Sequence, residues 1–320
     1  MAISGRAYRE AADIWRMREL LMRGKAAQIA ASYMHPGELY WMTYYPPDEE
    51  ANRRDIRVWE VGTGAGADAA GRDGAGKLAA WAIYCALEET FDLFVHPTLH
   101  GTPQHAAIMA DYVAWAERRA REAGLDHLSP FWVLDYDTVM DGLLKAHGFV
   151  PLEGPPPPLF ARGLEGELPP VELPPGFAVQ GVQGEEDGRL YASVSRGAFR
   201  PHDDWEAYWA RYARFMASPV YDGECHLFVR SPDGRGAAVC SIWYDEVNRI
   251  GLFEPVATHP DFQRRGLGKA VMAEGLRRLQ AGGMRRAILG TDPSNEPAKA
   301  LYRAMGFHVE SNFVFYRKEL

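Results

Sequence analysis

A proline-rich segment in the middle of the chain most constrains how this sequence can fold. Residues 151–175 contain an unbroken proline run at 155–158 and two further proline pairs. Proline lacks a backbone N–H and fixes φ, so such a segment favours an extended polyproline conformation over a helix or a central strand. We therefore expect a semi-rigid linker at 151–175 between two domains, 1–150 and 176–320.

Two short landmarks occur once in each half and in the same order. Val-His-Pro at 95–97 matches Thr-His-Pro at 258–260, and LLKAHGF at 143–149 matches LYRAMGF at 301–307. Repeated landmarks of this kind indicate an internal duplication. Shared turn chemistry is the alternative explanation, but two matches in one order favour duplication.

Both halves show one succession of elements, which predicts a mixed α/β fold for each. Apolar residues at helical spacing predict helices at 7–23, 106–123 and 266–280, the second of which ends at Gly124. Short apolar runs bounded by turn residues predict the strands. These are expected at 55–61, 77–84 and 91–95 in the first half and at 225–230, 237–244 and 250–258 in the second.

Charge and composition exclude several functions. A formal charge of −8 and a pI near 5.7 argue against nucleic-acid binding, which needs a concentrated basic surface, and suit a cationic partner. There is no leader-like segment and no apolar run of about 18 residues, so we expect a cytoplasmic protein without membrane association. Cys85, Cys225 and Cys240 are too widely spaced for a disulfide framework or a zinc site, and no metal is expected.

The segment 256–270 predicts a phosphate-binding site. Its pattern is a strand, a tight loop and the start of a helix. Gly266 and Gly268 allow a ligand to approach the backbone, and the N–H groups of a first helical turn bind anions. Arg264, Arg265 and Lys269 add positive charge where a pyrophosphate would lie.

This segment resembles the acetyl-CoA motif of the GNAT superfamily of N-acetyltransferases, Gln/Arg-x-x-Gly-x-Gly/Ala at the start of a helix. The matching residues are QRRGLG at 263–268. A second motif, NEPAKALYRAMGF at 295–307, resembles the family's Asn-x-x-Ala-x-x-Leu-Tyr-x-x-x-Gly-Phe. The resemblance implies two tandem GNAT (acyl-CoA N-acyltransferase) domains, with 176–320 as the catalytic domain that binds acetyl-CoA.

The resemblance also implies roles for single residues. Tyr302 would lie near the CoA sulfur and act as a general acid, with a core tyrosine as the alternative. Asn295 would contact the pantetheine arm or fix its loop, and a helix cap is a compatible role. The implied cofactor contacts are Val256, Ala257, Thr258, Gln263, Arg264, Arg265, Gly266, Leu267, Gly268, Lys269, Ala270, Asn295 and Tyr302.

A β-bulge in the fourth strand, whose N–H would polarise the thioester carbonyl, is implied near residues 256–258. Glu254 is the candidate general base because it precedes that bulge, with a structural ion-pair role as the alternative. His259 is a second candidate, but its place before Pro260 in a cofactor loop favours a loop-structuring role.

The first half has the order of a GNAT domain without its cofactor residues. Aligning the landmarks places Pro103 at Gly266 and Leu144 at Tyr302, which removes the anion cradle and the proton donor. We therefore expect 1–150 to be a degenerate repeat that does not catalyse. The segment 71–78 imitates a nucleotide P-loop, but it lacks the Ser or Thr that holds magnesium, and a hairpin loop is expected instead.

The predicted activity is direct acetyl transfer from acetyl-CoA to a primary amine of a small molecule or peptide. A non-catalytic acyl-CoA-binding regulatory module is the alternative, and an acceptor other than an amine stays open. The aromatic residues of 205–212 have helical spacing and predict either a core stripe or acceptor contacts. The oligomeric state stays open, with a homodimer among the options.

Overall fold

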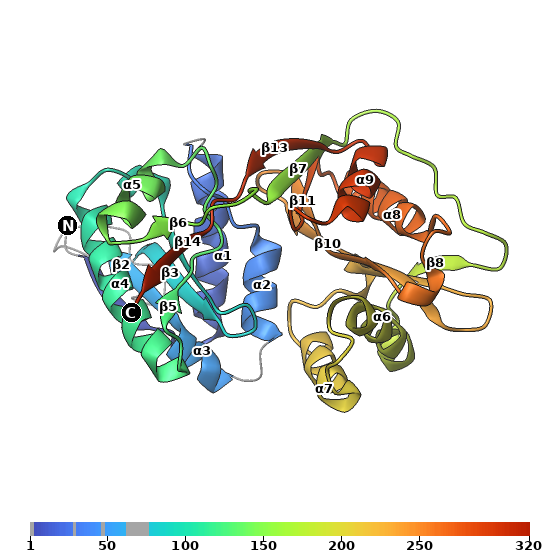
Figure 1. Cartoon of the computed structure of the whole chain (residues 1–320), viewed down its shortest axis with the longest axis horizontal. Helices are drawn as coiled ribbons and strands as arrows, with labels where there is room; N and C mark the ends of the chain where they lie inside the picture. The colour runs from blue at the N-terminus through green and yellow to red at the C-terminus, as the bar shows by residue number, and fades with distance from the viewer. Residues whose placement is uncertain (1–2, 28–29, 46–48, 62–76) are drawn as a thin grey trace. The chain divides into compact units, whose positions relative to one another are not determined.

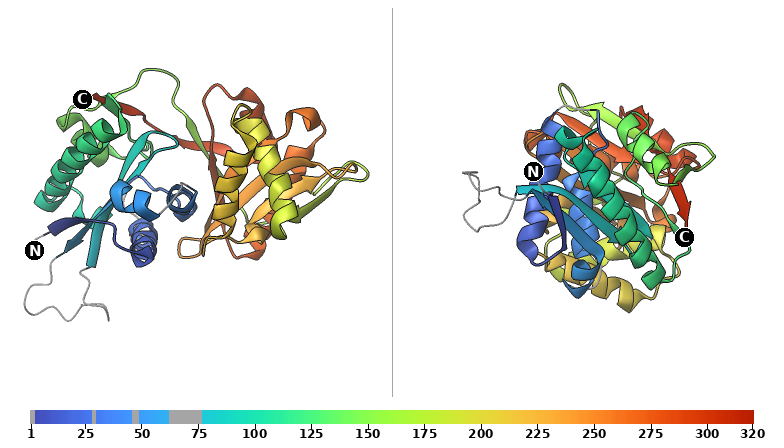
Figure 2. Two further views of the ribbon diagram at one scale, coloured as in Figure 1. Left: turned by 90° about the horizontal axis from the view of Figure 1, so that it is seen from below. Right: turned by 90° about the vertical axis from the view of Figure 1, so that its left-hand side faces the viewer.

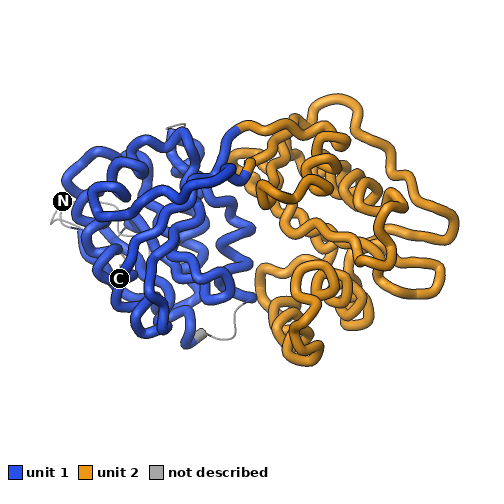
Figure 3. Tube along the Cα trace, viewed as in Figure 1, with its two compact units in different colours: residues 1–157, 311–320 blue, residues 158–310 orange. Residues whose placement is uncertain are grey.

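The computed structural model describes residues 3–27, 30–45, 49–61 and 77–320, which form two compact units (Figure 3). Unit 1 contains residues 1–157 and 311–320, and unit 2 contains residues 158–310. Most of the segment 71–78 lies outside the described residues. No helix of the described ranges is long and apolar enough to cross a membrane.

Unit 1 is an antiparallel sheet, in the order β1-β2-β3-β4, between two layers of helices (Figures 1 and 2). Alternate residues of β3 face opposite layers. Trp81 and Ile83 pack in one core with α1 and α2, and Ala80 and Ala82 pack in the other with α4. The elements are β1 (Ile3–Ala7), α1 (Ala11–Ala26), α2 (Pro36–Tyr44), α3 (Glu49–Asp55), β2 (Ile56–Val61), β3 (Lys77–Cys85), β4 (Thr90–Val95), α4 (Pro103–Ala123), β5 (His127–Leu128), α5 (Thr138–Ala146), β6 (Val150–Pro151) and β14 (Tyr316–Glu319).

Unit 2 has the same layering around a larger sheet, in the order β13-β7-β12-β11-β10-β9-β8. Cys240 and Ile242 of β10 pack in the core with α8, while Ser241 and Trp243 face the layer of α6 and α7. The elements are β7 (Pro158–Gly163), β8 (Ala178–Gly181), α6 (Gly184–Phe199), α7 (Trp205–Met216), β9 (His226–Arg230), β10 (Gly236–Asp245), β11 (Ile250–Thr258), α8 (Leu267–Ala281), β12 (Arg286–Gly290), α9 (Glu296–Ala304) and β13 (His308–Asn312). The mixed α/β fold expected from the sequence is confirmed.

Two strands lie in a different unit from the chain segment that precedes them. β7, which follows the first half of the chain, pairs with β12 of unit 2 from Leu159 to Gly163. β14, at the C-terminus, lies between β5 and β6 of unit 1. Figure 3 shows the chain passing from one unit to the other at both places. β7 therefore completes the large sheet of unit 2, and β14 completes a separate three-stranded sheet, β5-β14-β6, in unit 1.

The boundaries of these units differ from the domains expected from the sequence. The segment 151–175 is not a linker throughout, because 158–163 is a strand whose first four residues are buried. Pro158 begins that strand, where a missing N–H is tolerated. Residues 311–320, expected in the second domain, belong to unit 1. The proline content correctly indicates a restricted backbone, but it does not indicate with which distant strand a short segment will pair.

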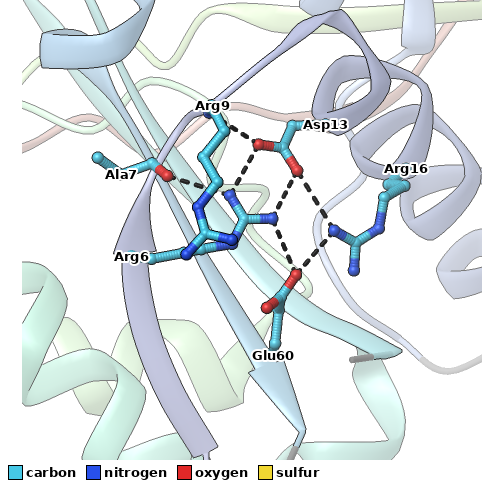
Figure 4. Close-up of polar contacts among 6 residues, drawn as sticks. All are labelled: Arg6, Ala7, Arg9, Asp13, Arg16 and Glu60. Carbon is cyan, nitrogen blue, oxygen red and sulfur yellow. Dashed lines mark hydrogen bonds and ion pairs between the residues drawn. The ribbon is translucent and has the colours of Figure 1, made fainter. Parts of the chain in front are cut away.

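A cluster of charged side chains ties α1 to the first two strands of unit 1 (Figure 4). Arg6 of β1 binds Asp13 of α1 at 2.6 Å and Glu60 of β2 at 2.9 Å, and Arg16 binds Glu60 at 2.7 Å. Burial acts to raise the pKa of Asp13, but hydrogen bonds from the Arg6 side chain and the Arg9 N–H outweigh it and lower that pKa below its ordinary value.

We expect Asp13→Asn to destabilise unit 1 by about 3 kcal/mol near neutral pH, because it removes the most buried carboxylate of the cluster. The folded-state pKa of Asp13 lies below the unfolded value of about 4, so its stabilisation is present above that value and is lost as pH falls through the folded pKa. Urea denaturation should show the difference between wild type and variant shrinking as the pH falls below about 4. Glu19→Gln, which breaks an exposed pair with Arg23 on the same helix, is the control and should cost less than about 1 kcal/mol. A pH-independent difference for Asp13→Asn would contradict this account.

Candidate functional site

Two neighbouring strands of unit 2 separate part of the way along their length. β11 pairs in parallel with β12 only from Ile250 to Leu252. Beyond this point β11 continues to Thr258, while β12 continues to Gly290 and pairs on its other side with β7. The result is a gap between β11 and β12. Among the residues that the structure describes, no strand pairs with the second half of β11 on that side.

A β-bulge lies where the gap opens. On β10, Cys240 pairs with Val256 and Ile242 pairs with Phe253, so Ser241 alone faces Glu254 and Pro255. The sequence predicted the bulge at 256–258, and the structure places it immediately before that range. Proline explains the shift, because Pro255 has no N–H to contribute to the β10 ladder.

The ladder beyond the bulge fixes the direction of the Val256 N–H. The backbone N–H of His259 donates a hydrogen bond to the carbonyl of Ala237 at 2.9 Å. These two residues are therefore a hydrogen-bonded pair of the antiparallel ladder. Hydrogen-bonded and non-hydrogen-bonded pairs alternate along an antiparallel ladder. Ala257 therefore bonds with Val239, whereas Val256, opposite Cys240, directs its N–H away from β10 and into the gap.

The N-terminus of α8 has the geometry of an anion site. Gly266 is the N-cap with φ of 80°, a conformation that favours glycine, and no side chain caps this helix among the residues that the structure describes. A Cβ on Gly268 would lie 3.3 Å from both Leu301 and Thr258. The first turn of α8 thus packs closely against the end of β11 with its N–H groups available for a ligand.

The predicted phosphate-binding residues divide into two kinds. Gln263, Arg264, Arg265 and Lys269 are exposed, so their side chains can reach a ligand in solution. Leu267 and Ala270, by contrast, are each 1% exposed and pack in the core. Leu267 can contribute its backbone N–H, whereas the N–H of Ala270 already donates to the carbonyl of Gly266 at 3.1 Å. Ala257 is likewise buried.

The structure adds one basic residue that the sequence reasoning missed. Arg235, in the turn before β10, forms an ion pair with Asp261 and lies 4.8 Å over the ring of Phe262. Arg265 lies 5.3 Å over the same ring. Arg235 belongs to no motif and lies far from the loop in sequence, so only the pairing of β10 with β11 brings it there.

Asn295 and Tyr302 lie at opposite ends of α9. Asn295 is the N-cap, and its side chain accepts a hydrogen bond from the N–H of Ala298 at 3.1 Å. Tyr302 is 6% exposed and packs edge-on against Phe160 of the exchanged strand β7, at 5.6 Å between ring centroids. The helix-cap and core roles considered for these residues are therefore present, and both are compatible with ligand contacts.

Glu254 and Tyr302 lie within electrostatic reach of each other. Burial, and next the charge of Glu254, raise the pKa of Tyr302 well above its ordinary value. The Glu254 side chain is exposed. His259, the other candidate base, accepts a hydrogen bond from the N–H of Asp261 at 3.3 Å, which supports its loop-structuring role. The phenol is thus kept protonated beside an accessible carboxylate.

The corresponding region of unit 1 is built differently, although a cavity lies beside β4 there, lined in part by Asp92, Val95 and Trp132. β3 and β4 pair from Ala80–Val95 to Cys85–Thr90 without a register shift, so no bulge exists there. The buried Asp92 of β4 accepts hydrogen bonds from the N–H groups of Phe131 and Trp132 at 2.8 and 2.9 Å. The segment that follows β5 is thereby held against β4, at the position that corresponds to the gap in unit 2. Thr102 caps α4 and Pro103 begins it. These features support the prediction that unit 1 is degenerate.

The aromatic side chains on α7 serve mainly as core. Tyr208, Trp209 and Tyr212 are each at most 8% exposed. Tyr212 stacks on Tyr191 of α6 with 5.1 Å between ring centroids. The core interpretation of this stripe is therefore supported over acceptor contacts for these three residues.

Comparisons with known proteins agree with this geometry. Residues 189–307 match the model of the acetyltransferase (GNAT) family. A mycothiol acetyltransferase of Streptomyces coelicolor is 28% identical over 159 residues, which cover 49% of this chain and 52% of that protein. The chain thus spans about half the length of this curated relative.

Two solved structures share the fold. A GCN5-related N-acetyltransferase from Sphaerobacter thermophilus aligns with a TM-score of 0.62 at 20% identity, covering 99% of this chain and 95% of its own. A tandem GNAT protein from the clavulanic acid biosynthesis pathway aligns with a TM-score of 0.68 at 16% identity, covering 99% and 98%. At these identities the likeness concerns the fold.

Proposed function

We propose that unit 2, whose part of the chain contains the match to the acetyltransferase (GNAT) family at residues 189–307, is an N-acetyltransferase that takes its acetyl group from acetyl-CoA. The whole chain has the tandem GNAT fold. The observation that carries the proposal is the gap between β11 and β12, into which the Val256 N–H points. The uncapped first turn of α8 supplies an anion site beside the same strand. Acetyl-CoA carries a thioester at one end of its pantetheine arm and a pyrophosphate at the other, so its binding and reaction need both an anion site and a directed N–H.

The first turn of α8 and its basic loop hold the pyrophosphate in this proposal. Gln263, Arg264, Arg265 and Lys269 offer side chains, and the turn from Gly266 to Lys269 offers N–H groups. Asn295 adjoins the pantetheine arm while capping α9. Of the β11 residues, Val256 offers its N–H, and Ala257 and Thr258 shape the wall of the gap.

Acetyl transfer then needs three groups around the thioester. The acceptor nitrogen attacks the carbonyl carbon, and the Val256 N–H stabilises the oxyanion that forms. Glu254 accepts the proton of the amine, directly or through water, as the carbon–sulfur bond breaks. Tyr302 donates its proton to the departing sulfur, and its raised pKa means that the phenol is protonated before the transfer begins.

The acceptor is proposed to be a primary amine of a small molecule or peptide. The relatives named mycothiol acetyltransferases make the unacetylated form of mycothiol the first acceptor to test. The net charge of −8 suits a cationic amine. A cytoplasmic location and a homodimer stay predictions.

Calorimetric titration with acetyl-CoA tests the cofactor site. We expect one saturable site per chain in the wild type and its loss in Gly266→Pro, because proline cannot adopt the φ of 80° at this N-cap. Gly283→Pro introduces the same strain at a φ of 81° beyond the other end of α8 and should retain binding. Circular dichroism checks that both variants fold.

The other outcomes are informative. Two sites per chain would contradict the degenerate role expected for unit 1, and no binding would contradict the acetyltransferase. Binding without turnover of any amine in a panel would favour the alternative, a non-catalytic acyl-CoA-binding module.

A further inference from the structure

The carbonyl of the bulge has a partner outside the backbone ladder. Trp243 of β10 donates a hydrogen bond from its indole Nε1 to the carbonyl oxygen of Glu254 at 2.9 Å. Trp243 is 8% exposed. Its ring packs against Phe215 of α7 and edge-on against His226 of β9, with centroid distances of 6.1 and 5.6 Å. The packing therefore fixes the position of the indole, whose N–H hydrogen-bonds to the bulge.

The ring of His226 is itself held in place. Its Nδ1 lies 2.8 Å from the Ser241 hydroxyl, which lies 2.7 Å from the Tyr191 hydroxyl. Ser241 is the residue that faces the bulge across the ladder. These two hydrogen bonds, together with the packing of the rings, restrict the orientations of the Tyr191, Ser241 and His226 side chains. The support beneath Trp243 thus consists of packed rings and a hydrogen-bonded chain.

The hydrogen bond from Trp243 controls a short and stiff piece of backbone. The Glu254 carbonyl belongs to the peptide unit that precedes Pro255, and the pyrrolidine ring fixes φ of Pro255. Only ψ of Pro255 then separates this anchored peptide unit from the one that carries the Val256 N–H. Anchoring the Glu254 carbonyl therefore restricts the direction in which the Val256 N–H can point.

We propose that Trp243 is a positioning residue for acetyl transfer, which aims the Val256 N–H at the thioester carbonyl by holding the carbonyl of Glu254. The inference rests on the proposed function of unit 2. Without the indole donor, the Glu254 carbonyl loses its side-chain partner and the bulge is free to rotate toward another donor or water. A misdirected N–H weakens oxyanion stabilisation more than it weakens binding of the CoA moiety.

The test is Trp243→Phe, which keeps an aromatic ring in the cluster and removes the donor. We expect kcat to fall about tenfold while KM for acetyl-CoA changes less than about twofold, a fraction of the effect of losing an oxyanion donor outright. Calorimetry with acetyl-CoA and with CoA supplies a readout that does not need turnover. The wild type should prefer acetyl-CoA, because only acetyl-CoA offers the carbonyl, and the variant should lose this preference.

Tyr244→Phe is the matched control. Tyr244 is the next residue of β10 and donates from its hydroxyl to the carbonyl of Arg278 at 3.3 Å, so this variant loses the same kind of bond away from the bulge. We expect it to keep both kcat and the preference for acetyl-CoA. Unchanged kcat and preference in Trp243→Phe, or equal losses in both variants, would overturn the positioning role. A wild type that binds acetyl-CoA in preference to CoA but acetylates no amine would count against the proposed function alone.

Discussion

Val256→Pro is expected to lower kcat for acetyl transfer by about 10²–10³-fold, the effect of removing one oxyanion donor. Val256 lies in a non-hydrogen-bonded pair with Cys240, so proline removes an N–H that the sheet does not use. The anion site at α8 is left intact. KM for acetyl-CoA should therefore stay within about threefold of the wild-type value, because the pyrophosphate and the pantetheine arm keep their contacts.

Steady-state kinetics and calorimetric binding measure the two effects separately. Val256→Ala shortens the side chain, keeps the N–H and serves as the control, so its kcat should remain near that of the wild type. Thermal denaturation shows whether proline disturbs the strand. Equal kcat values for the folded proline and alanine variants would exclude the Val256 N–H as the oxyanion donor.

The local structure of the proposed cofactor site could be predicted from the sequence because its residues are adjacent in the chain. The loop and first turn that contain Gly266 and Gly268 are adjacent in the chain, and glycine, basic side chains and a helix start are visible in the order of residues alone. The same is true of Asn295 as the cap of α9. Strand and helix types were also predictable where the apolar period was clear, as in β11 and α8.

The remaining parts depend on pairing between distant segments, which residue order does not report. Phe160 packs on Tyr302 because β7 pairs with β12, although proline composition suggested a linker there. Trp243 reaches Glu254, and Arg235 reaches Asp261, only through the register of β10 on β11. The position of the bulge also follows from that register, which a shift of one residue would change along the whole strand.

Tyr302→Phe is expected to lower kcat by about 10²-fold, because departure of the CoA thiolate loses its proton donor. Tyr302 packs against the rings of Phe160 and Phe307. These rings can pack against phenylalanine equally well, so acetyl-CoA binding should persist. Tyr112→Phe removes a buried hydroxyl of raised pKa in unit 1. It is the control and should leave the kinetics of unit 2 unchanged.

The pH dependence separates the acid from the base. Glu254→Gln removes the proposed proton acceptor, but the fraction of free amine grows as pH rises toward the amine pKa of about 10, so this variant should recover rate with rising pH. Tyr302→Phe should show no such recovery, because raising the pH lowers the proton concentration and cannot replace a missing proton donor. In the wild type, burial and the charge of Glu254 raise the pKa of Tyr302, so the phenol stays protonated and no loss of rate from its ionisation is expected below about pH 10. Recovery of Tyr302→Phe at high pH would instead assign the proton donor to water and leave Tyr302 as a core residue that packs against Phe160.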